Sequence, residues 1–350
     1  MQQRLIKIKK NKQSGKCNNV PHSGLKLEAH MSLDAAPLLL KAALHEKMWG
    51  GTRLQDYGFQ LPSDHTGEAW IASAHPHGPS TVMNGPFAGK TLGDVWQTTP
   101  ELFGGHKDGQ AFPLLVKILD ANRDLSIQVH PDDAYAQAHG DLYGKTESWY
   151  ILSAKPGAQL YYGHTAKTRD ELSQAVHSGH IRDILRTIPV KAGEFYYVPA
   201  GTLHALGTGI VALETQQSSD MTFRFYDFDR VDPSTGKKRD LQIDEALAVT
   251  MVPHHDPQIT PTTTQGDNYQ LNTLVSATYF TVEKLVVTGN AQLTQSHHYM
   301  IQTVIDGSGT LRVNHVDYPV KKGTTYLLPG PVKDYQLSGD LTIIGSFANK

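Results

Sequence analysis

This sequence predicts a mainly β fold with two β-barrel domains in tandem. Short segments rich in β-branched and aromatic residues recur along the chain, and Gly, Pro or Asn interrupts them, as is typical of strands joined by turns. The clearest predicted strands are 112–119, 125–130, 148–153 and 194–198. A weak internal repeat and a single stretch of helical periodicity support the same interpretation.

The internal repeat pairs residues 191–199 with residues 321–329. Each copy has a Gly, five further residues and then a Pro, which indicates a turn, a buried strand and a stop. Two such copies favour two related β-barrels. The first copy continues to His204, whereas the matching place in the second copy holds Asp334. A metal, if one is bound, is therefore expected in the first barrel only.

A short helical insertion is predicted near residues 168–188. Thr168 and Glu171 fit a capping box, and Gly179 is expected to divide the insertion into two short helices. The apolar residues that follow the box at mostly helical spacing are Leu172, Val176, Ile181, Ile184, Leu185 and Ile188. Residues 253–270 are rich in Pro, Thr and Asp and are interpreted as a linker.

Three parts of the chain follow from these features. We expect a basic extension over 1–31, a first β-barrel domain over 32–258 that would hold any metal, and a C-terminal domain without a metal site over 265–350. The helical insertion belongs to the domain 32–258. A length of 350 residues suits about two domains of roughly 100–200 residues each.

The extension is expected to be solvated and disordered. Seven basic residues and one acidic residue lie within 1–30, which leaves 25 basic and 33 acidic residues for the rest of the chain. An acidic body argues against nucleic acid as the main partner, because neutralising phosphates requires a basic surface. The extension lacks the apolar segment of a secretory signal, and no run approaches the roughly 18–20 apolar residues that span a bilayer.

Cysteine and histidine usage narrows the compartment and the metal chemistry. The single cysteine, Cys17, lies in the extension, so a disulfide within the chain is excluded and a reducing, cytoplasmic location is expected. Eighteen histidines accompany that one cysteine. Any bound metal is therefore expected to have imidazole, carboxylate or amide ligands.

The residues that follow the first repeat carry a metal-site pattern. The spacing Gly193-x5-Pro199-x-Gly201-x2-His204 resembles the second motif of the cupin family. In that motif a Pro/Gly turn ends one barrel strand and starts the next, so His204 can point into the barrel. A small barrel of jelly-roll topology has room for one metal ion and one small ligand.

Polar residues upstream supply partners for His204. Side chains alternate between the two faces of a strand, so Ser126, Gln128 and His130 share one face of segment 125–130, and the apolar residues between them pack on the other. A polar set inside a barrel is costly unless it binds something. The sequence therefore predicts a lined cavity at this strand.

A second polar pair, Lys145 and Glu147, shares one face in the same way. Each of these residues alone would be compatible with an ordinary core group that is hydrogen-bonded internally. Together, two nitrogen and two oxygen donors suit a divalent ion such as Zn²⁺, with positions open for a substrate. The candidate ligands are Gln128, His130, Glu147 and His204.

Three motifs, in this order, resemble type I mannose-6-phosphate isomerases in their short bacterial form. They are 127–133 (IQVHPDD), 144–147 (GKTE) and 214–220 (ETQQSSD), which Arg224 follows. The stretches 66–70 (TGEAW) and 112–121 (FPLLVKILDA) add support. The resemblance extends from about Pro37 to the C-terminus, so it covers nearly all of the chain except the extension.

The resemblance implies a zinc-dependent aldose–ketose isomerase that interconverts mannose 6-phosphate and fructose 6-phosphate through a cis-enediol(ate). One zinc ion per chain would be held by Gln128, His130, Glu147 and His204. The residues with an implied active-site role are Arg224, Asp220 and Glu214, and those implied to line the substrate cavity are Ser126, Lys145 and Arg230. Lys145 and Arg230 would also hold the phosphate.

Two other classes of protein remain open at this point. An Fe²⁺ dioxygenase of the cupin family usually has more histidine ligands, so Gln128 argues against it. A sugar-binding or regulatory cupin without activity would not need Lys145, Arg224 and Arg230. The expected partner is a sugar phosphate, with neither nucleic acid nor membrane, and the expected state is a monomer or a weak homo-oligomer.

Overall fold

Strands dominate the part of the chain that the computed structural model describes, which is residues 35–232 and 235–349. The prediction of a mainly β protein with few helices is confirmed. The basic extension predicted over 1–31 lies outside the described residues.

Three large sheets and one strand pair make up the β structure. The six-stranded sheet has the order β10-β7-β12-β5-β3-β2, with β2 Ala43–Gly51, β3 Thr66–Ser73, β5 Leu114–Ala121, β7 Glu147–Ala154, β10 Phe195–Val198 and β12 Ile210–Gln217. The five-stranded sheet has the order β13-β6-β11-β8-β9, with β6 Ile127–Val129, β8 Gln159–His164, β9 Leu185–Pro189, β11 His204–Leu206 and β13 Phe223–Tyr226.

The third sheet contains nine strands and most of the C-terminal part of the chain. Its order is β16-β17-β18-β22-β19-β21-β1-β4, and β20 pairs with β19. The bounds are β1 Leu38–Lys41, β4 Thr81–Val82, β16 Thr262–Gly266, β17 Tyr269–Ser276, β18 Phe280–Thr294, β19 Tyr299–Val313, β20 Val316–Lys321, β21 Thr325–Pro329 and β22 Asp334–Ala348. A separate pair consists of β14 Val231–Asp232 and β15 Lys237–Lys238.

Helices are short and lie in the connections between strands. The α-helices are α1 Leu92–Thr98, α2 Asp133–Ala138, α3 Arg169–His177 and α4 Ile243–Val249. The 3-10 helices are η1 Arg53–Tyr57, η2 Gly85–Phe87, η3 Pro100–Phe103 and η4 Ile181–Ile184. No helix within the described ranges has the length and apolar character that crossing a membrane requires.

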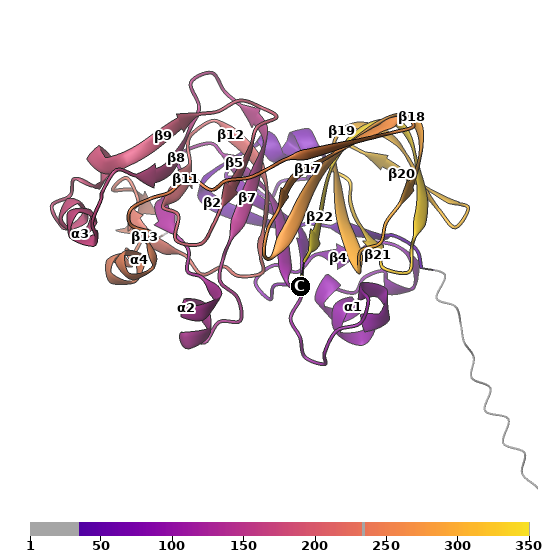
Figure 1. Cartoon of the computed structure of the whole chain (residues 1–350), viewed down its shortest axis with the longest axis horizontal. Helices are drawn as coiled ribbons and strands as arrows, with labels where there is room; N and C mark the ends of the chain where they lie inside the picture. The colour runs from indigo at the N-terminus through magenta and orange to yellow at the C-terminus, as the bar shows by residue number, and fades with distance from the viewer. Residues whose placement is uncertain (1–34, 233–234, 350) are drawn as a thin grey trace, which may run out of the picture. The chain divides into compact units, whose positions relative to one another are not determined.

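The six-stranded sheet is the middle of three layers, and the alternation of side chains along β5 shows why. Leu114, Val116 and Ile118 belong to the core shared with the nine-stranded sheet, whereas Leu119 and Ala121 belong to the core shared with the five-stranded sheet. In Figure 1, β5, β7 and β12 accordingly lie between β8, β9 and β11 on one side and β17 to β22 on the other. Both faces of the middle sheet are therefore buried.

The predicted strands and the repeated turn are confirmed. Segments 112–119, 125–130, 148–153 and 194–198 correspond to β5, β6, β7 and β10. Gly193 and Gly323 adopt φ values of +91° and +89°. Their amides donate to the carbonyls of Ile151 and Val304, both at 2.8 Å. Each repeat copy thus makes the same turn ahead of a strand.

The second half of the predicted helical insertion is not an α-helix, so this part of the prediction is wrong. Thr168 caps α3 by accepting from the Glu171 amide at 3.2 Å, but the Glu171 carboxylate accepts from the Lys167 amide instead of completing the box. After Gly179 the chain forms the single turn η4 and then strand β9, so Leu185 and Ile188 are not helical. Pairing of β9 with β8 outweighs the helical spacing of these residues.

The predicted linker 253–270 is also corrected in part, because β16 (Thr262–Gly266) lies within it and pairs with β17. Its β-branched threonines suit an exposed edge strand. The nine-stranded sheet takes β1 and β4 from the N-terminal part of the chain. One sheet thus contains strands from both predicted domain ranges, 32–258 and 265–350. These ranges remain a prediction.

Candidate active site and metal centre

A polar cavity of about 320 Å³ is lined by residues of β2, β3 and β5 from the middle sheet and of β6 and β13 from the five-stranded sheet. Its charged wall consists of Lys47, Lys117, Lys145, Arg224 and Arg239 with Glu68 and Asp220. Five cations against two carboxylates leave an excess of positive charge. The cavity therefore suits a small anionic ligand.

Strand alternation places the polar groups of the middle sheet at one end of its inner face. Along β12, Ile210 and Ala212 belong to the core that faces the five-stranded sheet. Glu214 continues the same face by period two and pairs in register with Lys117 of β5. Lys117 in turn pairs with Trp70 of β3. The interior is thus apolar at one end and charged at the other.

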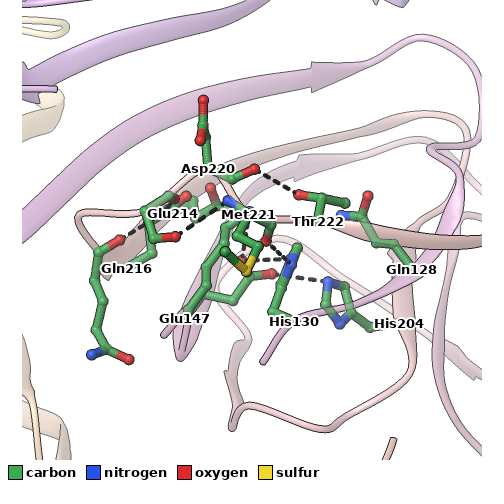
Figure 2. Close-up of polar contacts among 12 residues, drawn as sticks. Gln128, His130, Glu147, His204, Glu214, Gln216, Asp220, Met221 and Thr222 are labelled. Carbon is green, nitrogen blue, oxygen red and sulfur yellow. Dashed lines mark hydrogen bonds and ion pairs between the residues drawn. The ribbon is translucent and has the colours of Figure 1, made fainter. Parts of the chain in front are cut away.

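Three predicted metal ligands form one buried cluster (Figure 2). Glu147 Oε1 lies 3.2 Å from His204 Nε2, and Glu147 Oε2 lies 3.4 Å from His130 Nε2. One donor atom from each residue lies within 4.8 Å of the other two. Strands β7 and β11 and the residue that follows β6 bring these side chains together from distant parts of the sequence.

Hydrogen bonds at the outer ring nitrogens orient both imidazoles. His130 Nδ1 lies 3.0 Å from the Met221 carbonyl, and His204 Nδ1 lies 2.8 Å from the Thr202 carbonyl. A carbonyl accepts only, so Nδ1 must donate, and in the neutral ring Nε2 then carries the lone pair. Both Nε2 atoms and Glu147 Oε2 are buried without a hydrogen-bond partner among the described residues. These three atoms offer lone pairs toward one another without a hydrogen-bond partner, which is the arrangement of ligand atoms around a cation.

Burial keeps His130 in the neutral form that a metal ligand needs. Burial, followed by the nearby Lys145 ammonium, lowers the pKa of His130 well below its usual value. Burial alone would raise the pKa of Glu147, but Lys145, His130 and His204 outweigh it and lower that pKa. The carboxylate is therefore ionised beside the neutral His130 ring.

Gln128, the fourth predicted ligand, lines the cavity next to this cluster. It pairs in register with His204 on one side and with Arg224 on the other, so the three side chains share one face of the five-stranded sheet. Its Oε1 accepts from the Ser126 hydroxyl at 3.3 Å. Leu125 lines the cavity as well, which differs from the expected alternation because β6 begins only at Ile127.

Two buried lysines have opposite pKa shifts. Burial lowers the pKa of Lys145, although Glu147, at 3.5 Å from its Nζ, opposes that shift. Burial alone would also lower the pKa of Lys117, but Glu214 and other carboxylates outweigh burial and raise that pKa. Lys117 Nζ lies 3.1 Å from Glu214 Oε1 and donates to Gln216 Oε1 at 2.6 Å. The same three carboxylates, Glu68, Glu147 and Glu214, act on both ammoniums. Lys117 also has a hydrogen bond with Glu214, whereas the neighbouring Lys117 ammonium lowers the pKa of Lys145 further.

The three residues with an implied catalytic role occupy different depths. Arg224 lines the cavity, and its buried Nε has no hydrogen-bond partner in the described part of the chain. Burial and the neighbouring Arg239 lower the pKa of Arg224. Asp220 also lines the cavity. Glu214 does not; it is buried behind Lys117, where its Oε2 accepts from Trp149 Nε1 at 2.9 Å.

Of the three residues expected to contact substrate, Ser126 and Lys145 line the cavity and Arg230 does not. The Arg230 guanidinium pairs with the Asp227 carboxylate, and its Nε donates to the Asp227 carbonyl at 3.1 Å. Arg239 Nε also donates to Asp227, at 2.7 Å, yet Arg239 lines the cavity. Arg239 thus occupies the place expected for Arg230.

Sequence reasoning missed several cavity residues. They are His45, Lys47, Glu68, Trp70, His77, Lys117 and Arg239. A signal existed for Lys117, which is one of two charged residues, with Asp120, in the otherwise apolar run 112–121. Another existed for Glu68, two residues from Trp70 on a strand, whose Oε2 accepts from Trp70 Nε1 at 2.6 Å. No local pattern distinguishes His45, His77 or Arg239.

Comparison with known proteins covers the stretches that build this cavity. Residues 38–159 match the family model of the type I phosphomannose isomerase catalytic domain, and residues 270–348 match that of the mannose-6-phosphate isomerase cupin domain. A mannose-6-phosphate isomerase of Streptococcus mutans is 45% identical over 90% of this chain and 99% of its own length. Mannose-6-phosphate isomerase ManA of Bacillus subtilis is 44% identical over 87% of this chain and 96% of its own length.

A solved structure agrees with these matches. The crystal structure of the mannose 6-phosphate isomerase from Bacillus subtilis superposes with a TM-score of 0.86 at 46% identity, over 89% of this chain and 99% of that one. The cupin-type fold class predicted from the sequence is thereby confirmed. Because these similarities extend over nearly the whole described chain, the protein belongs to the type I phosphomannose isomerase family.

Proposed function

We propose that the protein interconverts mannose 6-phosphate and fructose 6-phosphate. The observation that carries this proposal is the cationic cavity directly beside the buried cluster of His130, Glu147 and His204. A phosphorylated sugar matches the cavity in charge, and about 320 Å³ is within the range of small-molecule sites. The names of the relatives point to the same reaction.

For the cofactor we propose one Zn²⁺ ion, held by Gln128, His130, Glu147 and His204. The supporting observation is that the two Nε2 atoms and Glu147 Oε2 are buried and unpartnered while both Nδ1 atoms donate to carbonyls. Imidazole, carboxylate and amide donors form a set that zinc accepts. When bound, such an ion supplies a Lewis acid next to the sugar carbonyl.

Isomerisation moves a proton between C2 and C1 of the open-chain sugar, in this proposal through a cis-enediolate. Arg224 is suited to donate hydrogen bonds to the oxygen on which charge develops, because its guanidinium stays protonated and its buried Nε is unpartnered. Glu214 acts indirectly, since its carboxylate holds Lys117 at the cavity wall. Asp220 lines the cavity as well.

The phosphate needs several cations at one place. Lys145 remains suited to this task, and the Ser126 hydroxyl can add a neutral hydrogen bond, because both residues line the cavity. For Arg230 to take part, its guanidinium would have to leave Asp227, which it shares with Arg239. Arg239 needs no such change, so we propose that it supplements or replaces Arg230 in holding the substrate.

A coupled assay that converts mannose 6-phosphate to fructose 6-phosphate tests the proposal. Purified protein is assayed as isolated, after chelation and after addition of Zn²⁺, with elemental analysis of each sample. Turnover that disappears on chelation and returns with zinc is expected. A metal-replete protein that binds the sugar phosphate without converting it would instead be a sugar-binding cupin. A protein whose reaction requires O₂ and Fe²⁺ would be a dioxygenase.

For the compartment we propose the cytoplasm. The chain has one cysteine, so no disulfide within it can form, and an oxidising environment would offer it no stabilisation of that kind.

A further inference from the structure

Two histidines and one aspartate meet at the rim of the cavity, away from the buried metal-ligand cluster. His77 Nδ1 lies 2.6 Å from Asp220 Oδ2, and His75 Nε2 lies 3.8 Å from Asp220 Oδ1. The His77 side chain is 68% exposed and the His75 side chain 12%. Both His77 and Asp220 line the cavity, so the pair faces a bound ligand.

A tight turn after β3 brings the two rings together. The Gly78 amide donates to the His75 carbonyl at 3.1 Å, and Pro76 lies between the histidines. The ring centroids of His75 and His77 are 4.9 Å apart. A Cβ at Gly78 would lie 2.4 Å from His45 Nε2, so only glycine lets this turn approach the cavity wall so closely.

Hydrogen bonds assign the protons of both rings. His75 Nδ1 accepts from the His77 backbone amide at 3.3 Å, so neutral His75 carries its proton on Nε2, the atom that faces Asp220. The Asp220 carboxylate can only accept when it is ionised, so its Oδ2 accepts from His77 Nδ1. His77 Nε2 is then left with a lone pair, and it makes no hydrogen bond within the described residues.

The same three residues lie close enough to hold a cation, but their hydrogen bonds favour another use. A metal would need the lone pair of His75 on Nε2. That tautomer would place the proton on Nδ1, opposite the His77 amide, and would lose the bond between them. An imidazole whose Nδ1 proton is held by a carboxylate is instead the arrangement of a general base.

On this geometry we propose that His77 transfers the proton that opens the sugar ring, with Asp220 and His75 as positioning residues. The inference is built on the proposed function, since only a cyclic aldose or ketose phosphate needs this step. His77 Nε2 takes the proton of the anomeric hydroxyl, and the electrons of that O–H bond form the carbonyl. The bond between the anomeric carbon and the ring oxygen breaks, and the ring oxygen takes the proton back from the imidazolium.

Lys117 and Glu68, which also line the cavity, are less suited to this step because they are already engaged. Lys117 is bound to Glu214 and Gln216, and Glu68 is bound to Lys47 and Trp70. Both oxygens of the hemiacetal are attached to the same carbon. One exposed imidazole nitrogen can therefore serve first one oxygen and then the other.

The test is His77→Ala in the metal-replete, full-length protein, with His65→Ala as the matched control. His65 Nδ1 also lies near a carboxylate, 2.9 Å from Asp64 Oδ1, but His65 does not line the cavity. General acid–base catalysis contributes about 10²–10⁴, so His77→Ala should lower kcat/KM roughly 10²-fold or more. His65→Ala should leave it unchanged.

Two further readouts separate a proton-transfer role from a structural one. Added imidazole should restore part of the activity of His77→Ala, because the side chain it replaces is exposed. In His77→Ala, slow ring opening should limit the rate in place of proton transfer from C2. The kinetic isotope effect of deuterium at C2 on kcat/KM should therefore fall toward unity. Asp220→Asn should show the same fall but resist rescue by imidazole, because His77 is then present in the wrong orientation or tautomer.

Rescue or a reduced isotope effect supports the inference. It is overturned if His77→Ala retains wild-type kcat/KM, or if activity falls with neither signature. It is also overturned if the wild type binds two ions per chain and His77→Ala binds one, which would make this cluster a metal site. Failure of the proposed function looks different, because the wild-type protein itself would not isomerise mannose 6-phosphate.

Discussion

Arg224 and Lys145 both face the cavity, but their surroundings assign them different work. Arg224 has a buried Nε without a partner in the described chain, whereas Lys145 Nζ lies 3.5 Å from Glu147 Oε2. A donor held without a partner is ready for charge that appears only during the reaction. An ammonium beside a carboxylate suits a group that is charged throughout, such as a phosphate. Interactions made only in the transition state affect kcat, and those made throughout affect KM.

Arg224→Ala is therefore expected to lower kcat by roughly 10²–10³, the effect of losing one donor to a developing oxyanion. Arg224→Lys should recover little of this loss, because an ammonium cannot reproduce the planar guanidinium. Steady-state kinetics on metal-replete protein measure both effects. A change in KM alone for Arg224→Ala would move Arg224 to the phosphate site.

Lys145→Ala is expected mainly to raise KM for the sugar phosphate, with a smaller change in kcat. Because Lys145 also contacts Glu147, metal content must be measured on the same samples. Zinc occupancy that falls in parallel with activity would show that Lys145 supports the metal ligand. A large fall in kcat at full occupancy would contradict its assignment to binding.

Glu68 should make stability depend on pH. Burial acts to raise the pKa of Glu68, but Lys47, Lys117 and the Trp70 indole outweigh it and lower the pKa to about 2. The unfolded value is about 4.3, so the folded state binds fewer protons and is stabilised above that pH. This stabilisation, about 3 kcal/mol at most, is lost as the pH falls from about 4 to 2.

Urea unfolding of the wild type and Glu68→Gln at pH 6 and pH 3 measures this linkage. The difference in the free energy of unfolding between the two proteins should be largest at pH 6 and about half as large at pH 3. Glu101→Gln, at an exposed site, serves as the control. Equal differences at both pH values would mean that Glu68 does not change its pKa on folding.

At the scale of elements, the same glycine turn precedes two strands, but the surroundings of the two turns differ. Gly193 and Gly323 have φ values of +91° and +89°, and each precedes a strand, β10 and β21. A Cβ at Gly193 would meet only the Tyr150 hydroxyl, at 3.9 Å. A Cβ at Gly323 would lie 1.8 Å from the Tyr57 carbonyl oxygen. Both glycines need a positive φ, but only Gly323 lies close to another backbone segment.

Alanine at the two positions should separate these two costs. Gly193→Ala is expected to cost about 1–2 kcal/mol, the price of a left-handed conformation for a residue with a Cβ. Gly323→Ala adds the displacement of backbone at Tyr57, and overpacking of this kind adds about 1–3 kcal/mol. Chemical denaturation measures both variants. Equal destabilisation would mean that the Tyr57 segment moves freely.

Across the whole molecule, the larger apolar core does not include the metal-ligand cluster, and the second core meets the cluster where the Trp149 and His204 ring centroids lie 5.3 Å apart. The larger core joins the middle and the nine-stranded sheets and includes none of the proposed ligands. The second core joins the middle and the five-stranded sheets around Trp149, Ile127 and Leu206. Most of the buried apolar surface therefore does not depend on an ion.

Chelation is accordingly expected to abolish turnover while the β-sheet signal in circular dichroism persists. Elemental analysis before treatment should give one ion per chain, because the second repeat has Asp334 where the first has His204. Two tightly bound ions per chain, or turnover that survives prolonged chelation, would contradict this expectation. Restoration by Zn²⁺ should follow the return of the ion.

Removing residues 1–30 should leave kcat and KM unchanged. This segment is basic and lies outside both family matches, which begin at residue 38. A sequence with so few large apolar side chains offsets little of its ordering entropy by burial. Kinetics of the shortened and full-length proteins test this. A large fall in kcat on truncation would make the segment part of the site.

The sequence alone determined the features that depend on neighbouring residues. Strands such as β7 and β10 were predictable from their β-branched and aromatic residues, and the turn at Gly193 from the repeated spacing of Gly and Pro. The buried cluster of His130, Glu147 and His204 was also predictable, because its members lie in motifs with a recognisable spacing. Local geometry carries this information, since alternation decides which face a side chain occupies.

Only the tertiary structure decided which distant groups meet. Strand β1 pairs with β21 across most of the chain, and His77 contacts Asp220 although 143 positions separate them. Arg239 lines the cavity and Arg230 does not, although the two residues flank the strand pair β14–β15 and both guanidiniums pair with Asp227. Such contacts depend on sheet order and on competition for one carboxylate, and no local pattern encodes either.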